Sequence, residues 1–261
     1  MENFYNLLKE IDVLFREHQN RQTLSYDERK ARYEKLRLEW TYNSNAIEGN
    51  SLSLSETSFY LREGLTSEGK PLIDYLEAKN HAEAIDWLQN VVKEKSPISE
   101  GFIKELNALL HKGISERPAV DPTGERVARH ISPGEYKKQP NHVLTLSGEI
   151  HYYVQPLKVP DEMRELVSLI NESKNGVHVV KLAADAHYEL TRIHPFDDCN
   201  GRTARILLNL ILMRAEYPAI VIKMEERRRY LEFLEEADKG NREPFSVFVG
   251  EHVKSALTFL K

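Results

Sequence analysis

Apolar side chains recur at helical spacing through most of the chain. They mark one face over residues 1–18, 26–42, 71–94 and 98–112, and a further helix is expected between the turn-rich stretch EGNSLSLSET and residue 71. The pattern returns in the C-terminal half over 160–173, 177–193, 201–215, 225–239 and 244–260. A period of three to four residues gives each helix one buried face, so the chain is predicted to be mainly α.

One segment departs from this pattern. Residues 117–158 are rich in proline and glycine, and within them HVLTL and IHYYV form two β-rich arms on either side of Ser147 and Gly148. Such arms around a short polar turn predict an antiparallel hairpin at 142–154. The expected architecture is a helical bundle with one exposed β-hairpin.

The composition is typical of a globular protein and limits its partners. Hydrophobic residues make up 41% of the 261 residues, and the net charge of −5 argues against nucleic-acid or membrane-surface binding. No apolar run is long enough to span a bilayer, and the acidic start does not resemble a signal peptide. Cys199 is the only cysteine. Neither an intrachain disulfide nor a cysteine-based zinc cluster is therefore expected, and a cytoplasmic location is predicted.

The stretch IHPFDDCNGRTAR at 193–205 concentrates functional groups just before an apolar helix. Pro195 disfavours helical backbone at His194, so the preceding helix should end there. The polar loop that follows leads into a helix N-terminus, where unpaired N–H groups and the helix dipole favour an anion. Arg202 and Arg205 share one face of that first turn, and each can bind phosphate oxygens through a forked guanidinium.

The same loop offers a metal ligand and a base. A carboxylate there can hold Mg²⁺, which takes few protein ligands and shares the rest with phosphate and water. A histidine at the loop's edge can accept a proton near neutral pH. Taken separately, these features are ordinary: HPF ends helices, DD and NG form turns, and paired arginines often face solvent. Their conjunction predicts Mg²⁺–nucleotide binding beside a general base.

The loop resembles the Fic family motif HPFx(D/E)GN(G/K)RxxR. Every fixed position matches except one, because Cys199 stands where glycine is usual. The stretches HYELTRI, LLNLILMRAEYPAIVI and RRRYLEFLEEADKGNREPFSVF are also similar to Fic-domain sequence. The resemblance implies a Fic-fold helical bundle with one β-hairpin flap. It divides the chain into an N-terminal helical region at 1–94 and a catalytic core at 95–261.

The resemblance also implies an activity, which is transfer of AMP from ATP to a Ser, Thr or Tyr hydroxyl of a protein. His194 would be the general base, and Asp198 would hold Mg²⁺ against the α- and β-phosphates. Arg202 and Arg205 would bind the outer phosphates and offset the charge on the leaving pyrophosphate. Such a transfer depends mainly on positioning and charge neutralisation. Asp197 occupies the family's variable position and is assigned no chemistry.

The remaining nucleotide contacts follow from the same resemblance. Cys199, Asn200 and Gly201 would contribute to a phosphate cradle with the loop amides. The helix with Tyr230 and Asp238 would form a wall of the adenine pocket, and Asp238 would accept a hydrogen bond from the adenine amino group, although many relatives have Asn there. If φ at Cys199 is positive, its side chain costs about 1 kcal/mol or more, whereas at negative φ it fits freely.

A second motif lies before the core. TYNSNAIEGN at 41–50 matches the Fic inhibitory motif (S/T)xxxE(G/N) through Ser44, Glu48 and Gly49. The resemblance implies that Glu48 pairs with Arg205, so that its carboxylate competes for the γ-phosphate site. The inhibitor would then be part of the same chain, as in class II Fic proteins. In some relatives this glutamate also helps to hydrolyse AMP from the target, and the sequence leaves that second activity open.

The expected partners are ATP and an unknown target protein held by strand addition at the 142–154 hairpin. The chain itself is a further expected target, and a homodimer is left open.

Two alternative functions remain. One is a Fic enzyme with another phosphate-containing donor, although phosphate-transferring relatives usually carry Lys at the position of Gly201. The other is a non-catalytic interaction module, in which Cys199 would mark a degenerate loop.

Overall fold

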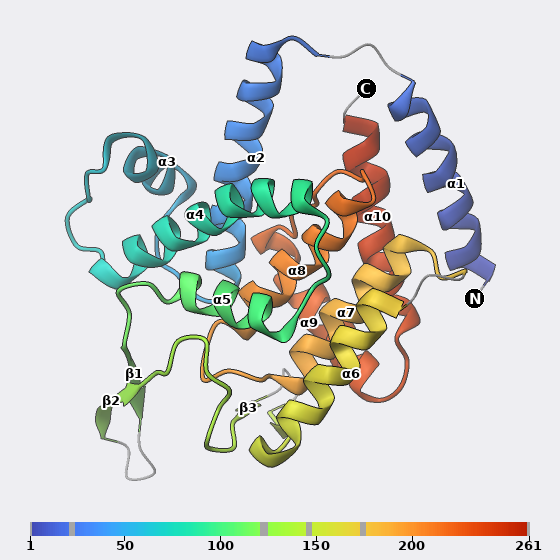
Figure 1. Cartoon of the computed structure of the whole chain (residues 1–261). Helices are drawn as coiled ribbons and strands as arrows, with labels where there is room; N and C mark the ends of the chain where they lie inside the picture. The colour runs from blue at the N-terminus through green and yellow to red at the C-terminus, as the bar shows by residue number, and fades with distance from the viewer. Residues whose placement is uncertain (1, 21–23, 121–124, 145–147, 173–175, 260–261) are drawn as a thin grey trace.

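The structure is a computed structural model that describes residues 2–20, 24–120, 125–144, 148–172 and 176–259. Within these residues it is predominantly helical, which confirms the predicted class (Figure 1). The described residues form the α-helices α1 (Glu2–Gln19), α2 (Tyr26–Ile47), α3 (Leu54–Glu63), α4 (Leu72–Glu94), α5 (Glu100–Leu110), α6 (Val159–Glu172), α7 (Val179–Ile193), α8 (Asn200–Arg214), α9 (Arg227–Asp238) and α10 (Glu243–Phe259).

Helix α8 lies at the centre of the bundle and is surrounded by the other helices (Figure 1). Its apolar run is buried on nearly every side, as expected for a helix that is hydrophobic all round. Helix α1 packs along α10, where Gly250 allows Leu7 to approach closely. The N-terminal helix is therefore held by the C-terminal one.

The larger of two apolar clusters in the described residues joins α1, α2 and α4 to the rest of the chain. Ile11 of α1, Trp40 of α2 and Ile85 of α4 belong to the same buried cluster as Phe248 of α10. The boundary predicted between residues 94 and 95 falls in the connection from α4 to α5. A division into two regions remains a prediction, and their side chains share this core.

Two small antiparallel sheets accompany the helices, where the sequence predicted one hairpin. Strands β3 (His142–Leu144) and β4 (Ile150–Tyr152) pair as predicted, although Ser147 of the predicted turn lies outside the described residues. Strands β1 (Glu116–Val120) and β2 (Arg126–His130) form a second hairpin that was not predicted. Its arms, ERPAV and RVARH, are rich in charge and lack the alternation by which strands are recognised.

Helix α2 is longer than its sequence pattern indicated. It begins with a capping box between Ser25 and Glu28 and continues beyond residue 42 to Ile47. The added turns are polar and carry no apolar period, yet they are buried against the bundle. Ser44 therefore lies within the last turns of a helix, and Glu48 is its C-terminal cap.

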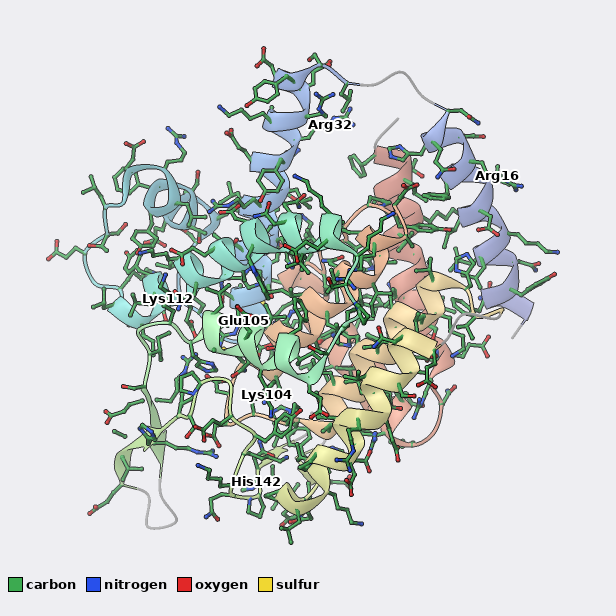
Figure 2. All side chains as sticks on the ribbon, in the orientation of Figure 1. Arg16, Arg32, Lys104, Glu105, Lys112 and His142 are labelled. Carbon is green, nitrogen blue, oxygen red and sulfur yellow. The ribbon has the colours of Figure 1, made fainter. Side chains whose placement is uncertain are left out.

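Charged side chains cover the outer faces of the helices. Figure 2 shows Arg16 on α1 and Arg32 on α2 pointing away from the body of the molecule. None of the helices in the described part of the chain combines the length and the apolar character that a membrane crossing requires.

Among the buried histidines, His187 and His81 have lowered pKa values that make the stability of the fold sensitive to acid. Burial, followed by the charge of Arg205, lowers the pKa of His187 to about 3, and burial with nearby arginines lowers the pKa of His81 well below its usual value. Since unfolded histidines bind protons near pH 6.5, the unfolded state gains protons first as the pH falls. Their contribution is full above that pH and decreases below it.

We therefore expect the free energy of unfolding to fall below pH 6.5 by about 1.4 kcal/mol per pH unit for each of the two histidines. Urea unfolding at a series of pH values between about pH 7 and about pH 4 measures this slope. His81→Gln removes one of these groups and should reduce the slope by about 1.4 kcal/mol per pH unit. An unchanged slope in that variant would contradict the assignment.

Candidate active site

The candidate site is built on the loop between α7 and α8. Helix α7 ends at Ile193, and His194 follows with φ of 50°, in the left-handed region, immediately before Pro195. The predicted helix end at His194 is therefore confirmed. At the other end of the loop, Cys199 precedes α8 with φ of 61°.

Cys199 occupies a backbone conformation that favours glycine. Its side chain is buried, and its positive φ corresponds to the strained case, with a cost of about 1–2 kcal/mol. Burial raises the pKa of the Cys199 thiol well above its usual value. The thiol is therefore neutral at physiological pH.

Hydrogen bonds fix the shape of the loop. The side chain of Asn200 accepts from Phe196 N and donates to Phe196 O, both at 2.9 Å. Asn107 of α5 donates to Asp198 O at 3.0 Å, and Lys137 N donates to Pro195 O at 2.8 Å. The Asn200 amide therefore holds the loop backbone in place, and its contribution to a phosphate cradle remains a prediction.

His194 lies on the wall of a pocket, with its ring plane fixed by an aromatic neighbour. Tyr153, just after β4, stacks on the imidazole with ring centroids 3.7 Å apart. The Nδ1 atom lies 3.4 Å from Thr191 O, which can only accept. Burial, and then the charge of Lys137, lower the pKa of His194 to about 3, so the ring is neutral at physiological pH.

The pocket beside His194 has a volume of about 560 Å³, which is within the usual range for small-molecule sites. Gly201 of α8 and Tyr230 of α9 line it, together with the hairpin β3–β4. Tyr230 is buried, and its hydroxyl lies 3.1 Å from His187 Nε2. Asp238, at the far end of α9, accepts a hydrogen bond from Tyr188 at 3.1 Å. The structure thus brings Tyr230 and Asp238 to the same pocket as His194.

Arg205 is held by the end of α2. Its Nη2 atom lies 2.7 Å from Glu48 Oε1 and donates to Ser44 O at 2.9 Å, while Nε donates to the Ser44 hydroxyl at 3.0 Å. Gly49 follows with φ of 94°, which ends the helix. Gly201 contributes by lacking a side chain, because a Cβ atom there would clash with the Glu48 carboxylate. The ion pair expected from the inhibitory motif is therefore present.

Arg202 is paired with an acid that the sequence did not reveal. Its Nη1 atom lies 2.7 Å from Glu77 Oε1 and 3.2 Å from Asn45 Oδ1. Arg117 of β1 also contacts Glu77. Both arginines of the motif are thus occupied by carboxylates, Arg205 by Glu48 and Arg202 by Glu77.

Asp198 is surrounded by positive and polar groups. Arg117 Nε lies 2.7 Å from its Oδ2 atom, and His111 Nε2 and Arg202 Nη2 lie at 3.6 and 3.7 Å. Burial alone would raise the pKa of Asp198, but His111 and the two arginines hold it well below its usual range. Asp198 is ionised, and it borders a second pocket of about 340 Å³.

The two pockets meet at Glu48, which lines both of them. The larger has a neutral histidine and aromatic walls, and the smaller has acids and arginines that suit a metal ion and phosphates. Glu77, Arg117, His111 and Tyr153 were missed by sequence reasoning. Tyr153 falls within the predicted hairpin but was assigned no role, whereas the other three belong to no recognised motif and meet the loop only through the fold. Together, the pockets form a candidate site on a helical bundle, with charges that suit a phosphate-containing ligand.

Comparison with known proteins agrees with this class of site. A family model described as Fic/DOC family matches residues 97–212. The protein adenylyltransferase Fic of Nematostella vectensis is 32% identical over 213 residues, which cover 80% of this chain and 45% of the relative. A solved structure of a Fic domain containing signaling protein from Bacteroides thetaiotaomicron is 33% identical with a TM-score of 0.82, covering 99% of this chain and 95% of that one.

A solved structure of Caenorhabditis elegans Fic-1 also has a TM-score of 0.82, at 29% identity, and covers 99% of this chain and 72% of that one. The chain belongs to the Fic/DOC family. It spans less than half the length of the curated adenylyltransferases that it matches.

Proposed function

We propose that the chain is a protein adenylyltransferase that transfers AMP from ATP to a Ser, Thr or Tyr hydroxyl of a target protein. The observation that carries this proposal is the meeting of two pockets at the N-terminus of α8. One contains His194 and the other contains Asp198, Arg117 and Arg202. The similarity to proteins named as adenylyltransferases supports the same reaction.

In this proposal the adenosine occupies the larger pocket, between α9 and the hairpin, beside Tyr230 and Asp238. The phosphates extend past Gly201 towards Arg202 and Arg205. The helix N-terminus and the two guanidiniums would neutralise the phosphate charge during transfer. Asp238 is a natural acceptor for the adenine amino group, since a carboxylate oxygen can only accept.

His194 would act as the general base. Because Nδ1 faces a carbonyl oxygen, the neutral ring carries its proton there and leaves Nε2 free to accept another. The target hydroxyl would give its proton to Nε2 while its oxygen attacks the α-phosphorus. The bond from the α-phosphorus to the bridging oxygen breaks, and pyrophosphate leaves with that electron pair. The stacked Tyr153 keeps the imidazole in one plane for this transfer.

Mg²⁺ fits the residues around the smaller pocket. Asp198 offers an ionised carboxylate beside Asp74, Glu77 and Asp197, and carboxylate oxygens are the ligands that Mg²⁺ prefers. Asp198 would be its protein ligand. When bound, the ion would neutralise charge on the α- and β-phosphates.

The pairing of Glu48 with Arg205 would inhibit the enzyme in the same chain, as in class II Fic proteins. Arg205 is 5% exposed in its side chain and already has three contacts with Ser44 and Glu48. A γ-phosphate arriving there would meet a carboxylate in its place, and like charges repel. Release of Glu48 would then be required before ATP binds productively. Whether Glu48 also directs hydrolysis of AMP from the target is left open.

The hairpin β3–β4 would hold the target segment. Its exposed apolar side chains include Val143, Ile150 and Tyr152, and it forms one side of the pocket that contains His194. A strand added to its edge would bring a hydroxyl of the target close to the base, with little demand on sequence. The chain's own exposed hydroxyls are candidate targets as well. A homodimer is neither required nor opposed by these contacts.

The test of the proposed reaction compares two labelled forms of ATP. Transfer of AMP should carry an α-phosphate label onto protein and leave a γ-phosphate label in pyrophosphate. Transfer of the γ-phosphate would instead carry the γ label onto protein and leave the α label in ADP. The assay is best done with Glu48→Gly, so that inhibition does not hide the activity. Label from γ-labelled ATP alone on protein would reject AMP transfer in favour of the other donor chemistry.

The contact of Arg117 with Asp198 leads to a prediction about metal binding. A guanidinium 2.7 Å from the carboxylate competes with a divalent ion for the same oxygen. Arg117→Gln should therefore strengthen Mn²⁺ binding about fivefold, since a partly exposed ion pair contributes about 1 kcal/mol. Electron paramagnetic resonance of free Mn²⁺ measures this affinity without nucleotide.

Arg129→Gln is a matched control for this prediction. Arg129 lies on the same hairpin, but its contact is with Asp197, at 3.8 Å. Its substitution should leave the affinity for Mn²⁺ close to that of the wild type. Equal affinities in wild type and Arg117→Gln would mean that Arg117 does not compete for Asp198.

A further inference from the structure

Cys199, which departs from the family motif, lies beside two other potential metal ligands. One ligand atom from each of Cys199, Asp198 and His111 lies within 4.8 Å of the others. Mg²⁺ is bound through oxygen, whereas a thiol, an imidazole and a carboxylate together are a donor set for Zn²⁺ and similar thiophilic ions. We propose that His111, Asp198 and Cys199 form an inhibitory site for a thiophilic divalent ion of the Zn²⁺ type.

The imidazole of His111 is already oriented as a metal ligand. It is fully buried at the end of α5, and its Nδ1 atom lies 3.1 Å from Asn107 O. Because a carbonyl oxygen only accepts, Nδ1 must donate, and the lone pair of the neutral ring is on Nε2. Metal-bound histidines usually have such a second nitrogen bonded to a backbone carbonyl, which fixes the tautomer.

The Nε2 atom has no hydrogen-bond partner among the described residues. It faces Asp198 Oδ2 at 3.6 Å, and this carboxylate oxygen is also an acceptor. In the neutral tautomer two acceptor atoms then face each other in a buried place, and a proton or a metal ion between them would stabilise this arrangement. The Cys199 thiol does not supply such a proton, since it makes no hydrogen bond to Nε2.

The charges around the site favour a thiolate-binding ion over Mg²⁺. Without an ion, the carboxylates of Asp198 and Glu77 balance the guanidiniums of Arg117 and Arg202. A divalent ion adds two positive charges, and binding through Cys199 releases the thiol proton and removes one of them. Mg²⁺ at the same point would release no proton, so both added positive charges would remain. The thiol therefore gives Zn²⁺ a specific advantage.

Arg117 has to leave Asp198 when the ion binds. Its side chain is 23% exposed and is carried by the β1–β2 hairpin at the surface, so it can withdraw towards solvent while keeping Glu77 as a partner. Arg202 is more deeply held and remains with Glu77. Water would complete the four ligands that Zn²⁺ takes in an open site.

The inhibitory consequence rests on the proposed function, whereas the site itself does not. An ion on Asp198 and Cys199 would occupy the carboxylate assigned to Mg²⁺ and hold the loop before α8. AMP transfer would then stop in the presence of Zn²⁺, independently of Glu48. A chain with Gly at position 199 would lack this response.

The test uses the full chain, stripped of metal and titrated with Co²⁺ as a spectroscopic substitute for Zn²⁺. The wild type should develop a thiolate-to-cobalt charge-transfer band in the near ultraviolet, and added Zn²⁺ should abolish it. Cys199→Gly should lack the band and bind Zn²⁺ at least about tenfold more weakly, as should His111→Gln. Asp197→Asn is the matched control, because this neighbouring acid is outside the ligand set, and it should leave both results unchanged.

Circular dichroism establishes that each variant is folded, and Cys199→Gly carries the test alone if His111→Gln is not. The proposal is overturned if the wild type gives no charge-transfer band, or if Cys199→Gly binds Zn²⁺ as tightly as the wild type. A thiol that merely donates its proton to Asp198 would give the first of these results.

An activity assay separates this inference from the proposed function. Zn²⁺ should inhibit AMP transfer by Glu48→Gly but leave Glu48→Gly/Cys199→Gly at least about tenfold less sensitive. If no variant transfers AMP while the cobalt band is present, the proposed function fails and the ion site stands. If transfer proceeds but no band forms, the ion site fails and the proposed function stands.

Discussion

Glu48→Gly should transfer AMP from Mg-ATP at least about tenfold faster than the wild type, with a gain in mass of one AMP on the chain or on an added target. The reason is the contact of Glu48 Oε1 with Arg205 at 2.7 Å in the interior of the site. Removing the carboxylate frees a buried guanidinium for the γ-phosphate and removes a repelling charge. A tenfold gain requires about 1.4 kcal/mol, which is less than the usual cost of an unpaired buried charge.

Glu48→Gln separates charge from backbone effects, because it keeps the length of the side chain and the helix end. It should also be activated, although less than Glu48→Gly, since the amide can still contact Arg205. Glu39→Gln is the control on the same helix, where the acid pairs with Lys223 at the surface, and its rate should match the wild type. Equal rates for Glu48→Gly and wild type, with ATP binding confirmed by calorimetry, would show that this carboxylate does not inhibit.

The second large effect is expected at the base. In the Glu48→Gly background, His194→Ala should lower the rate of AMP transfer by about 10²–10⁴-fold, the usual contribution of general base catalysis. ATP affinity should change by less than about fivefold, because the proposed role of His194 is toward the target hydroxyl and it is assigned no phosphate contact. Single-turnover transfer and calorimetric binding of ATP measure the two effects separately.

His151→Ala is the informative comparison, since His151 lines the same pocket and lies 3.6 Å from Asp238. Its loss should affect nucleotide binding more than the chemical step. If His151→Ala lost the rate and His194→Ala retained it, the base would have been assigned to the wrong histidine. A loss of ATP binding in His194→Ala would instead point to a structural role of the ring that stacks on Tyr153.

The features predicted correctly from sequence are those with local causes. Pro195 requires the helix to end at His194, and the spacing of Arg202 and Arg205 places both on the first turns of α8. The apolar periodicity located the helices to within a few residues. Glu48 could be connected to Arg205 only through resemblance to a family, because no local rule links residues so far apart in the chain.

The features that sequence reasoning missed depend on tertiary contacts. Glu77 meets Arg202 from another helix, and Arg117 reaches Asp198 from a hairpin whose strands lack alternation. The hydrogen bonds by which Asn200 holds the loop at Phe196 were not predicted, and its predicted phosphate contact remains a prediction. A polar side chain has the same appearance in a sequence whether it contacts a ligand or its own backbone.

The absence of a side chain at Gly201 links the choice of phosphate donor to the proposed inhibition by Glu48. A Cβ atom there would displace the Glu48 carboxylate from its place against Arg205. A lysine at position 201 would therefore require the Glu48 carboxylate, which is proposed to be inhibitory, to shift from its present place. The choice of donor and the proposed autoinhibition by Glu48 would then have to change together, because both depend on residue 201.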